Sequence, residues 1–350
     1  MRAELVLTSD SCCALNGRLA AWCLGPASVG LLSGLLCPGA QAIMVFKTSD
    51  ITYNTTAPGG SLTGSGWQYE GTWGSFLGTA IAPNYFVTAT HVGGTTGDTF
   101  IYNGSSYTTT AHFSSPASDL TVWQVSGAFP TYAPLYSGSD EAGRGLLVIG
   151  RGPARSDSVV FNDRSEAVGW EIGTGRGTVR WGENVVASAP SLTGLGRMLL
   201  ATFDRTGGDN EAMLAGGDSG GGVFVQEGGI WKLAGINYGI NGPFNTSASD
   251  TGSFFGALYN TDGLYENVGS GWDYVEHDGS DTPAYWVATS ISANKSWLDS
   301  VAPVPEPHAW AGATGGFLAV FAFVRRHIRL RAEERTAADG RRIGLAGGQV

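Results

Sequence analysis

The chain lacks cysteine over most of its length. All four cysteines precede Ile43, namely Cys12, Cys13, Cys23 and Cys37. No disulfide can therefore hold together the part that follows Ile43. Its stability must come from an apolar core, and 42% hydrophobic residues are enough to build one rather than leave the chain disordered.

Charge is also scarce, and most of it has one sign. Charged residues make up 14% of the chain, well below a typical value of about 25%. Between Ile43 and Val324 there are 11 Lys and Arg against 25 Asp and Glu, which gives 11 − 25 = −14. Nucleic acid carries negative charge, so this net negative charge argues against nucleic acid as a partner.

Residues 1–42 have the order of a secretory signal peptide. Arg18 precedes an apolar stretch over 19–36, and Ala40-Gln41-Ala42 is the small-x-small pattern that signal peptidase accepts. A membrane anchor is the alternative, but glycines and prolines interrupt the run. We expect signal peptidase to cleave after Ala42, so that the rest of the chain is exported.

The other end, over 303–350, has a three-part order of its own. The motif Val304-Pro305-Glu306-Pro307 is followed by an apolar segment over 309–324 and an arginine cluster over 325–331. This order resembles the PEP-CTERM sorting signal of Gram-negative bacteria, which an exosortase recognises and cleaves. The resemblance implies a transient membrane anchor, an exosortase-like sorting enzyme as a partner, and a final place at the cell surface or in the extracellular matrix. An ordinary tail anchor is the alternative, and it too would leave the body outside the membrane.

Short apolar or alternating runs fill the body between these two ends. Gly, Asn, Asp, Ser and Pro separate them at regular spacing, which predicts an antiparallel all-β fold, sandwich or barrel. The clearest runs are 75–82, 86–90, 99–102, 120–125, 146–149, 222–226, 230–236 and 284–289. Only 292–301 predicts a helix, with Ser292 as its N-cap and Pro303 as its stop.

Three local patterns suggest chemistry, in the chain order His, Asp, Ser. His91 follows the apolar run 86–90, Asp119 precedes the run 120–125, and Ser219 lies in the glycine-rich string 216–221. Acyl transfer by a serine needs an imidazole to take the hydroxyl proton and a carboxylate to orient that imidazole. Taken singly, each pattern also has an ordinary structural interpretation: a glycine-rich loop, a structural histidine and a turn aspartate.

Together the three patterns resemble the trypsin/chymotrypsin family of serine proteases. That family has its histidine in a Thr-Ala-Ala-His context, where this chain has Thr-Ala-Thr-His over 88–91, and it shares the string Gly-Asp-Ser-Gly-Gly, found here over 217–221. The resemblance covers about 75–301. It implies two antiparallel six-stranded β-barrels and a short C-terminal helix, with His91 and Asp119 in a first barrel over 43–130 and Ser219 in a second over 131–302.

The activity that the resemblance implies is that of a serine endopeptidase acting on protein or peptide substrates. The glycines around Ser219 would let the N–H groups of Gly217 and Ser219 form an oxyanion hole. The order of the three residues along the chain argues against an esterase of the α/β-hydrolase type, because in that type the nucleophile precedes the histidine. A catalytically inert surface or matrix binding module on the same fold is the alternative.

We expect no cofactor and no metal, because the histidines are scattered without metal-ligand spacing. An acidic loop over 273–281 could bind calcium, but a solvated loop is the simpler interpretation.

Substrate preference depends on two positions in the resemblance. Family enzymes that cleave after Lys or Arg place an Asp six residues before the nucleophile, where this chain has Met213. Those that prefer Glu commonly use a His in the strand corresponding to 236–238, where this chain has Asn237. With Leu214 beside it, Met213 predicts a substrate pocket for an apolar or small side chain rather than a basic one.

Asp218 has a further role in the resemblance. In this family the aspartate before the nucleophile pairs with the ammonium group of a new N-terminal Ile or Val. Cleavage after Ala42 would expose Ile43 as such a terminus. The alternative is that Asp218 pairs with a side chain or with backbone donors and needs no free terminus.

Overall fold

The computed structural model describes residues 43–175 and 177–303, and all of these except Pro303 belong to one unit. The expected signal peptide over 1–42 and, apart from Pro303, the expected sorting signal over 303–350 lie outside the described residues and stay predictions. Within the part of the chain that the structure describes, no helix is both long and apolar enough to span a membrane.

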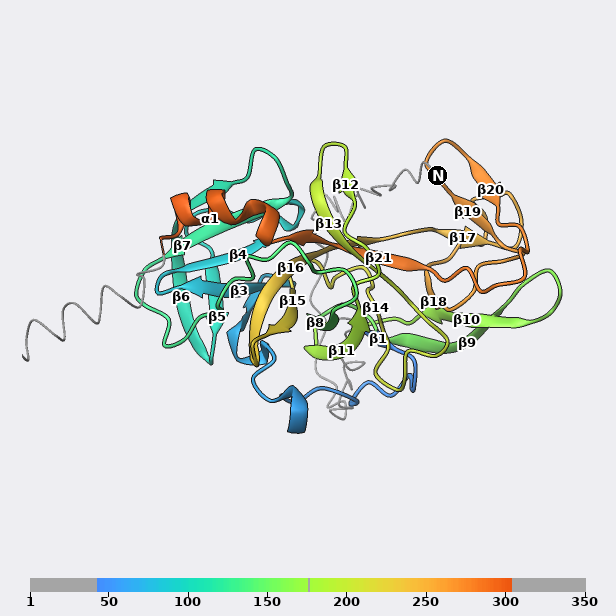
Figure 1. The fold of residues 1–350 in the computed structure, drawn as a ribbon, viewed down its shortest axis with the longest axis horizontal. Helices are drawn as coiled ribbons and strands as arrows, with labels where there is room; N and C mark the ends of the chain where they lie inside the picture. Colours follow the sequence, from blue (N-terminus) through green and yellow to red (C-terminus); the bar gives the residue numbers. More distant parts are fainter. Residues whose placement is uncertain (1–42, 176, 304–350) are drawn as a thin grey trace, which may run out of the picture. The chain divides into compact units, whose positions relative to one another are not determined.

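The first half of the unit is a closed six-stranded antiparallel barrel (Figure 1). Around the barrel the strands are ordered β2-β3-β4-β7-β6-β5. They are β2 Glu70–Trp73, β3 Phe76–Ala82, β4 Tyr85–Ala89, β5 Thr99–Tyr102, β6 Ser105–Ser114 and β7 Leu120–Val125. Aromatic side chains fill the interior, with Phe86 and Phe100 stacked at 3.9 Å between ring centroids.

The second half is built on a seven-stranded antiparallel sheet with the order β11-β8-β15-β16-β21-β13-β12. These strands are β8 Gly145–Gly150, β11 Arg180–Val185, β12 Ser191–Leu192, β13 Gly196–Thr202, β15 Gly222–Glu227, β16 Ile230–Ile240 and β21 Tyr285–Ser290. The segment 126–144 joins the two halves, and the domain boundary expected after residue 130 stays a prediction.

The second half differs from the six-stranded barrel expected from the resemblance. A seventh strand is present because the short β12 turns back and pairs with β13 at the edge of the sheet. At the other edge, four backbone bonds join the chain beyond β11 to β13. Ala187 and Ser188 N–H both donate to Leu200 C=O (2.9 and 3.3 Å), Leu200 N–H donates to Ser188 C=O (2.9 Å), and Met198 N–H donates to Pro190 C=O (2.8 Å). The structure thus contains one closed barrel and one curled seven-stranded sheet.

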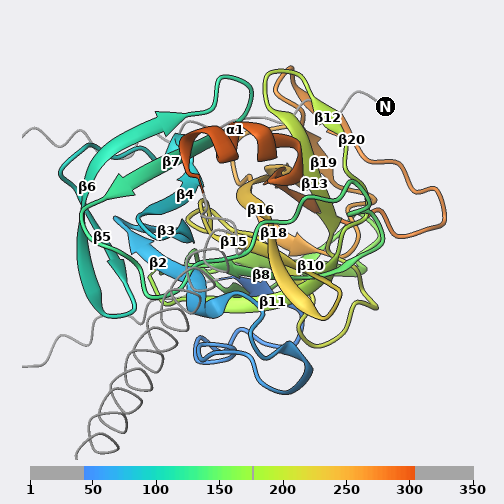
Figure 2. The ribbon, with the colours of Figure 1, turned by 60° about the vertical axis from the view of Figure 1, so that its left-hand side comes forward.

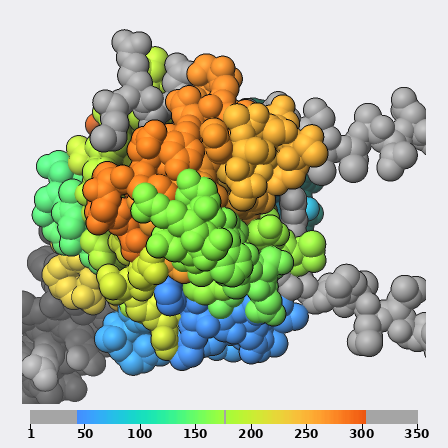
Figure 3. Space-filling model, turned by 90° about the vertical axis from the view of Figure 1, so that its right-hand side faces the viewer, coloured from blue at the N-terminus to red at the C-terminus, as the bar shows by residue number. Residues whose placement is uncertain are grey.

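Smaller sheets extend the second half, and the two with three strands lie on the side away from the barrel (Figure 1). Two of them have three strands each, in the orders β18-β10-β9 and β17-β19-β20, and a third pairs β1 with β14. Their strands are β1 Met44–Val45, β9 Arg155–Phe161, β10 Ala167–Ile172, β14 Ala212–Met213, β17 Phe244–Asn245, β18 Gly256–Leu258, β19 Tyr265–Asn267 and β20 Trp272–Tyr274. Figure 3 shows the green β9–β10 hairpin on this face, above the blue segment that begins the described chain.

Helical structure is confined to short segments. The helical turns are η1 Gly60–Leu62, η2 Trp67–Tyr69, η3 Thr90–Val92 and η4 Ser292–Asn294, and the last one leads into α1 Lys295–Val301. The last described helical segment returns to the first barrel, where Ser118 Oγ lies 2.8 Å from Asn294 Oδ1 (Figures 1 and 2). The expected mostly-β chain with a short C-terminal helix is confirmed.

Candidate active site

The register of two barrel strands brings His91 to Asp119. Ala89 ends β4 opposite Leu120, the first residue of β7. The residues just beyond this pair are therefore neighbours, and Thr90 N–H donates to the backbone carbonyl of Asp119 (3.2 Å). The carboxylate of Asp119 then holds His91 twice: Oδ1 accepts the backbone N–H at 3.0 Å, and Oδ2 lies 2.6 Å from Nδ1 of the ring.

Ser219 comes from the second half and completes this hydrogen-bonded series. Its Oγ lies 2.8 Å from Nε2 of His91. A tight turn between β14 and β15 presents the hydroxyl, and Gly217 (φ 110°) and Gly220 (φ 80°) give that turn its left-handed backbone. The structure thus brings together the three residues that the sequence patterns singled out, across the junction of the two halves.

The expected oxyanion-hole residues have unused backbone donors. The N–H groups of Gly217 and Ser219 form no hydrogen bond with any residue in 43–175 or 177–303. Such groups can donate to a ligand oxygen when they converge on it.

Asp218, next to the nucleophile, is a buried carboxylate surrounded by backbone donors. It is 1% exposed. Its Oδ1 accepts the N–H of Gly152 at 2.6 Å and that of Ile43 at 3.4 Å, and its Oδ2 accepts the N–H of Ala215 at 2.8 Å. Burial raises the pKa of Asp218 to about 6, although these N–H groups act in the opposite direction. The carboxylate thereby ties the nucleophile turn to the end of β8 and to the start of the described chain.

Asn237 on β16 belongs to the site in a way that the sequence did not predict, because the resemblance linked its position only to substrate preference. Its fully buried side chain donates from Nδ2 to the carbonyls of Ile149 (2.8 Å) and Asp218 (3.0 Å). Its backbone also bonds to both residues after the nucleophile, with Gly220 N–H donating to its carbonyl and its own N–H donating to Gly221. Nothing local in the sequence shows this role, because every partner comes from a distant segment or from backbone atoms.

Met213 and Leu214, the expected pocket residues, lie in the hydrophobic core. They are 0% and 2% exposed, and Met213 pairs with Met44 between β14 and β1. Their lining of a substrate pocket stays a prediction.

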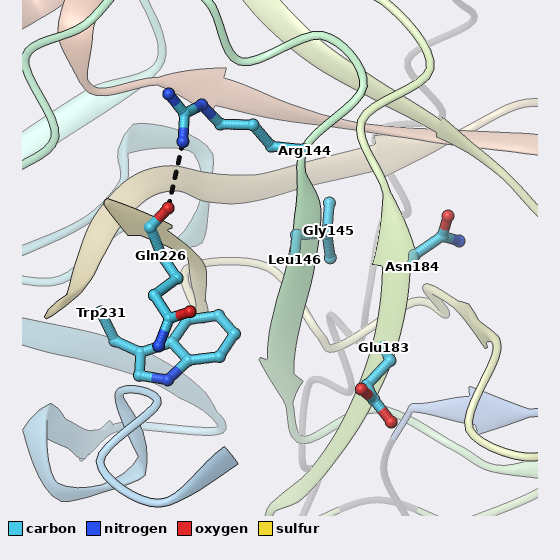
Figure 4. Close-up of a pocket in the computed structure, with 7 residues that line it drawn as sticks. All are labelled: Arg144, Gly145, Leu146, Glu183, Asn184, Gln226 and Trp231. Carbon is cyan, nitrogen blue, oxygen red and sulfur yellow. Dashed lines mark hydrogen bonds between the residues drawn. The ribbon is translucent and has the colours of Figure 1, made fainter. Parts of the chain in front are cut away.

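A shallow hollow of about 340 Å³ lies elsewhere on the second half, between β8, β11, β15 and β16 (Figure 4). Its lining does not include the three clustered residues and consists of Arg144, Gly145, Leu146, Glu183, Asn184, Gln226 and Trp231. Among the described residues, no group of three or more His, Cys, Asp or Glu is placed to hold a metal ion.

Comparison with known proteins gives matches in structure only. No family model and no curated protein matches the chain. Solved structures of proteases are among those with a similar fold, at low sequence identity.

One is the active form of the Rv3671c protease from M. tuberculosis, at 13% identity and a TM-score of 0.38, covering 66% of this chain and 74% of that one. Another is neuropsin, a serine protease of mouse brain, at 16% identity and a TM-score of 0.39, covering 68% and 94%. A third is the passenger domain of the plasmid-encoded toxin of Escherichia coli, at 13% identity and a TM-score of 0.38, of which this chain spans 21%.

Proposed function

We propose that the chain is a serine endopeptidase that hydrolyses peptide bonds through an acyl-enzyme. The observation that carries the proposal is the pair of hydrogen bonds that links Ser219 Oγ to His91 Nε2 and His91 Nδ1 to Asp119 Oδ2. A neutral hydroxyl is a weak nucleophile, and an imidazole at hydrogen-bond distance can remove its proton during attack. The bond between Nδ1 and Asp119 Oδ2 favours the tautomer in which Nδ1 keeps its hydrogen and Nε2 is the base.

In the proposed reaction, Ser219 Oγ attacks the scissile carbonyl while its proton moves to Nε2 of His91. The carbonyl oxygen becomes an oxyanion, which the N–H groups of Gly217 and Ser219 would stabilise. The C–N bond then breaks, His91 gives its proton to the leaving amine, and an ester to Ser219 remains. The same imidazole then takes a proton from a water molecule that attacks the ester. The bond between the acyl carbon and Oγ breaks, the imidazolium returns the proton to Oγ, and the carboxylic acid product leaves.

The three residues support acyl transfer in general, and the choice of a peptide substrate comes from the sequence resemblance. Export through the signal peptide and sorting at the C-terminus remain parts of the proposal that the described residues do not reach. The competing function is an inert binding module. The hydrogen bonds that link Ser219, His91 and Asp119 favour catalysis over it.

Labelling with a fluorophosphonate tests the proposal directly. This reagent reacts with an activated serine, so the folded protein should be labelled at Ser219, and the position can be read by mass spectrometry of the digested protein. Ser219→Ala and His91→Ala are the matched controls and should lose the label while keeping the unfolding midpoint of the wild type. A folded wild type that takes no label and cleaves no peptide of a diverse library would favour the inert module.

A further inference from the structure

Arg151, the residue that follows β8, is a half-buried cation held by two backbone carbonyl groups. Its Nε donates to the carbonyl of Gly177 at 2.8 Å, and its Nη1 donates to that of Gly74 at 3.0 Å. These bonds use two of the five N–H donors of a guanidinium. Nη2 is not buried and has no hydrogen-bond partner among residues 43–175 and 177–303. The side chain is thus fixed in place while part of its donor capacity stays free.

No carboxylate of the described residues compensates the charge of Arg151. Burial lowers its pKa, and none of these residues carries a charge that acts in the opposite direction. Arg144 and Arg197 differ, because each bonds to a carboxylate. Their partners are Asp140 at 2.6 Å and Glu141 at 2.8 Å. Taking a cation out of water costs free energy unless an anion lies near it, so an anion gains more at Arg151 than at a guanidinium that is already paired.

The backbone of Arg151 lies beside the nucleophile turn. Asp218 precedes Ser219, and both chain neighbours of Arg151 contact its carboxylate. A Cβ on Gly150 would lie 2.2 Å from Oδ1 of Asp218, and the N–H of Gly152 donates to the same oxygen at 2.6 Å. The side chain of Arg151 therefore begins next to the residue that precedes the nucleophile.

From there the side chain of Arg151 runs to the first barrel. Gly74, which accepts from Nη1, lies in the turn between β2 and β3. Three residues further along the chain, the carbonyl of Leu77 would be 2.5 Å from a Cβ on Gly220. Because a strand advances by about 3.3 Å per residue, the guanidinium lies roughly 10 Å from the nucleophile turn, at the junction of the two halves. An extended peptide advances by a similar amount, so the guanidinium lies within about three residues of a bond held at Ser219.

We propose that Arg151 is a specificity-determining residue, whose Nη2 binds a carboxylate of the peptide substrate within about three residues of the scissile bond. This inference rests on the proposed function. A hydrogen bond between a guanidinium and a carboxylate is charge-assisted, and therefore stronger than a neutral one. The carboxylate comes from an Asp or Glu side chain, or from the C-terminus of a short substrate. The residue directly before the scissile bond is a separate position, for which the sequence predicts an apolar or small side chain.

Paired peptide substrates test this preference on the full chain. Each pair has Asp in one member and Asn in the other, at one of the three positions on either side of the scissile bond apart from the residue directly before it. All of these peptides are amidated at the C-terminus. A second set has a free C-terminal carboxylate and no acidic side chain, which distinguishes the two sources of the carboxylate. In the wild type we expect kcat/KM to be at least tenfold higher for the member with the carboxylate, at one position or in the second set.

Arg151→Met removes the charge, so the ratio of kcat/KM between the two members of a pair should fall to within twofold of 1. Because the ratio is taken within one variant, a general loss of activity does not change it. Arg151→Lys keeps the charge and should keep part of the preference. Arg144→Met is the matched control and should keep the wild-type ratio, because that guanidinium is already paired with Asp140. If Arg151→Met does not fold, Arg151→Gln takes its place, since its amide can still donate to the carbonyl of Gly74.

A wild type that cleaves peptides without either preference would overturn the proposal. A preference that persists in the folded variant without the charge would overturn it as well, because another group would then bind the carboxylate.

Binding to Ser219→Ala separates this proposal from the proposed function. The variant lacks the nucleophile, so Kd can be measured by fluorescence anisotropy for every pair of peptides without cleavage. We expect one carboxylate-bearing peptide to bind at least fivefold more tightly than its neutral counterpart, and this difference to disappear when Arg151→Met is added. Equal Kd values in all pairs, or no binding at millimolar concentration, would overturn the role of Arg151. If the wild type cleaves no peptide, the proposed function fails, while this measurement still decides whether Arg151 binds a carboxylate.

Discussion

Gly220, the residue after the nucleophile, lies directly against Thr88 of the first barrel. A Cβ on Gly220 would be 2.3 Å from Thr88 Oγ1 and 2.5 Å from the carbonyl of Leu77, and this hydroxyl itself donates to that carbonyl at 2.8 Å. The Ser219 turn from the second half is therefore in close contact with β3 and β4, the latter being the strand that leads to His91. This contact fixes how the nucleophile approaches its base.

Gly220→Ala should disturb both the turn and its contact with the barrel. The backbone at Gly220 has φ 80°, which an alanine adopts only with strain, and the new methyl group would overlap Thr88 and Leu77. We expect a loss of about 1–3 kcal/mol in the free energy of unfolding and at least tenfold slower labelling of Ser219. Gly145→Ala is the control, because its Cβ would meet no atom within 4 Å. Wild-type stability and labelling in Gly220→Ala would show that the close contact is unimportant.

Asp119→Asn should impair catalysis while leaving the fold intact. The amide keeps the size of the carboxylate but cannot both accept from the His91 ring and stabilise its positive charge. We expect kcat to fall by roughly a thousandfold or more with little change in the unfolding midpoint. Steady-state kinetics on a peptide substrate and thermal unfolding measure the two effects. A fall in kcat of less than tenfold would mean that Asp119 does not orient the base.

Local patterns in the sequence were sufficient to find the three clustered residues. His91 and Asp119 each adjoin an apolar run, and the glycines around Ser219 are needed for the left-handed backbone of its turn. Such signals are short in sequence, so they can be recognised without knowing the fold. The short helix over 292–301 was also predicted from local signals, although the expected N-cap was wrong: Ser292 is the first residue of η4, and its side chain caps no helix.

The residues that support the site could not be found in this way. Asn237 bonds to backbone atoms of Ile149 and Asp218, and the N–H of Gly152, just beyond β8, donates to Asp218. These relationships depend on sheet register between distant segments, for which the sequence carries no local signal. The resemblance likewise did not predict the added β12 strand or the smaller sheets of the second half, because it was specific only around the three motifs.

Glu70→Gln should flatten the dependence of stability on pH. Glu70 Oε1 accepts from Thr79 at 2.7 Å, whereas its Oε2 is buried without a hydrogen-bond partner among the described residues. Burial raises the pKa of Glu70 from 4.5 to about 8. The folded state therefore holds this proton between these two pH values while the unfolded state has released it, and stability falls as pH rises through the window, by up to roughly 1.4 kcal/mol per pH unit.

Denaturant unfolding at pH 5 and pH 8 measures this effect. A neutral amide at position 70 does not titrate, so we expect Glu70→Gln to lose less stability than the wild type between the two pH values. Part of the fall should persist, because burial also raises the pKa of Glu211 to about 8. Glu166→Gln, at an exposed carboxylate, is the control and should keep the wild-type slope. A Glu70→Gln slope equal to that of the wild type would show that Glu70 is charged in the folded protein at pH 8.

Met213→Asp distinguishes a core role for this residue from a pocket role. The sequence resemblance places Met213 where enzymes that cleave after Lys or Arg have an aspartate. In the structure its side chain is fully buried, and its backbone pairs with Met44. An aspartate there would be an unpaired carboxylate in a core that excludes water, and an unpaired buried charge destabilises by several kcal/mol. We therefore expect Met213→Asp to unfold at a markedly lower denaturant concentration than the wild type, and to gain no cleavage after Arg.

Met213→Leu, which nearly conserves volume and apolar character, is the matched control and should lose less than about 1.5 kcal/mol in the free energy of unfolding. Profiling with a peptide library reads the residue before the scissile bond in all three proteins, and we expect an apolar or small residue there. A stable Met213→Asp protein that cleaves rapidly after Arg would place position 213 in the substrate pocket instead of the core.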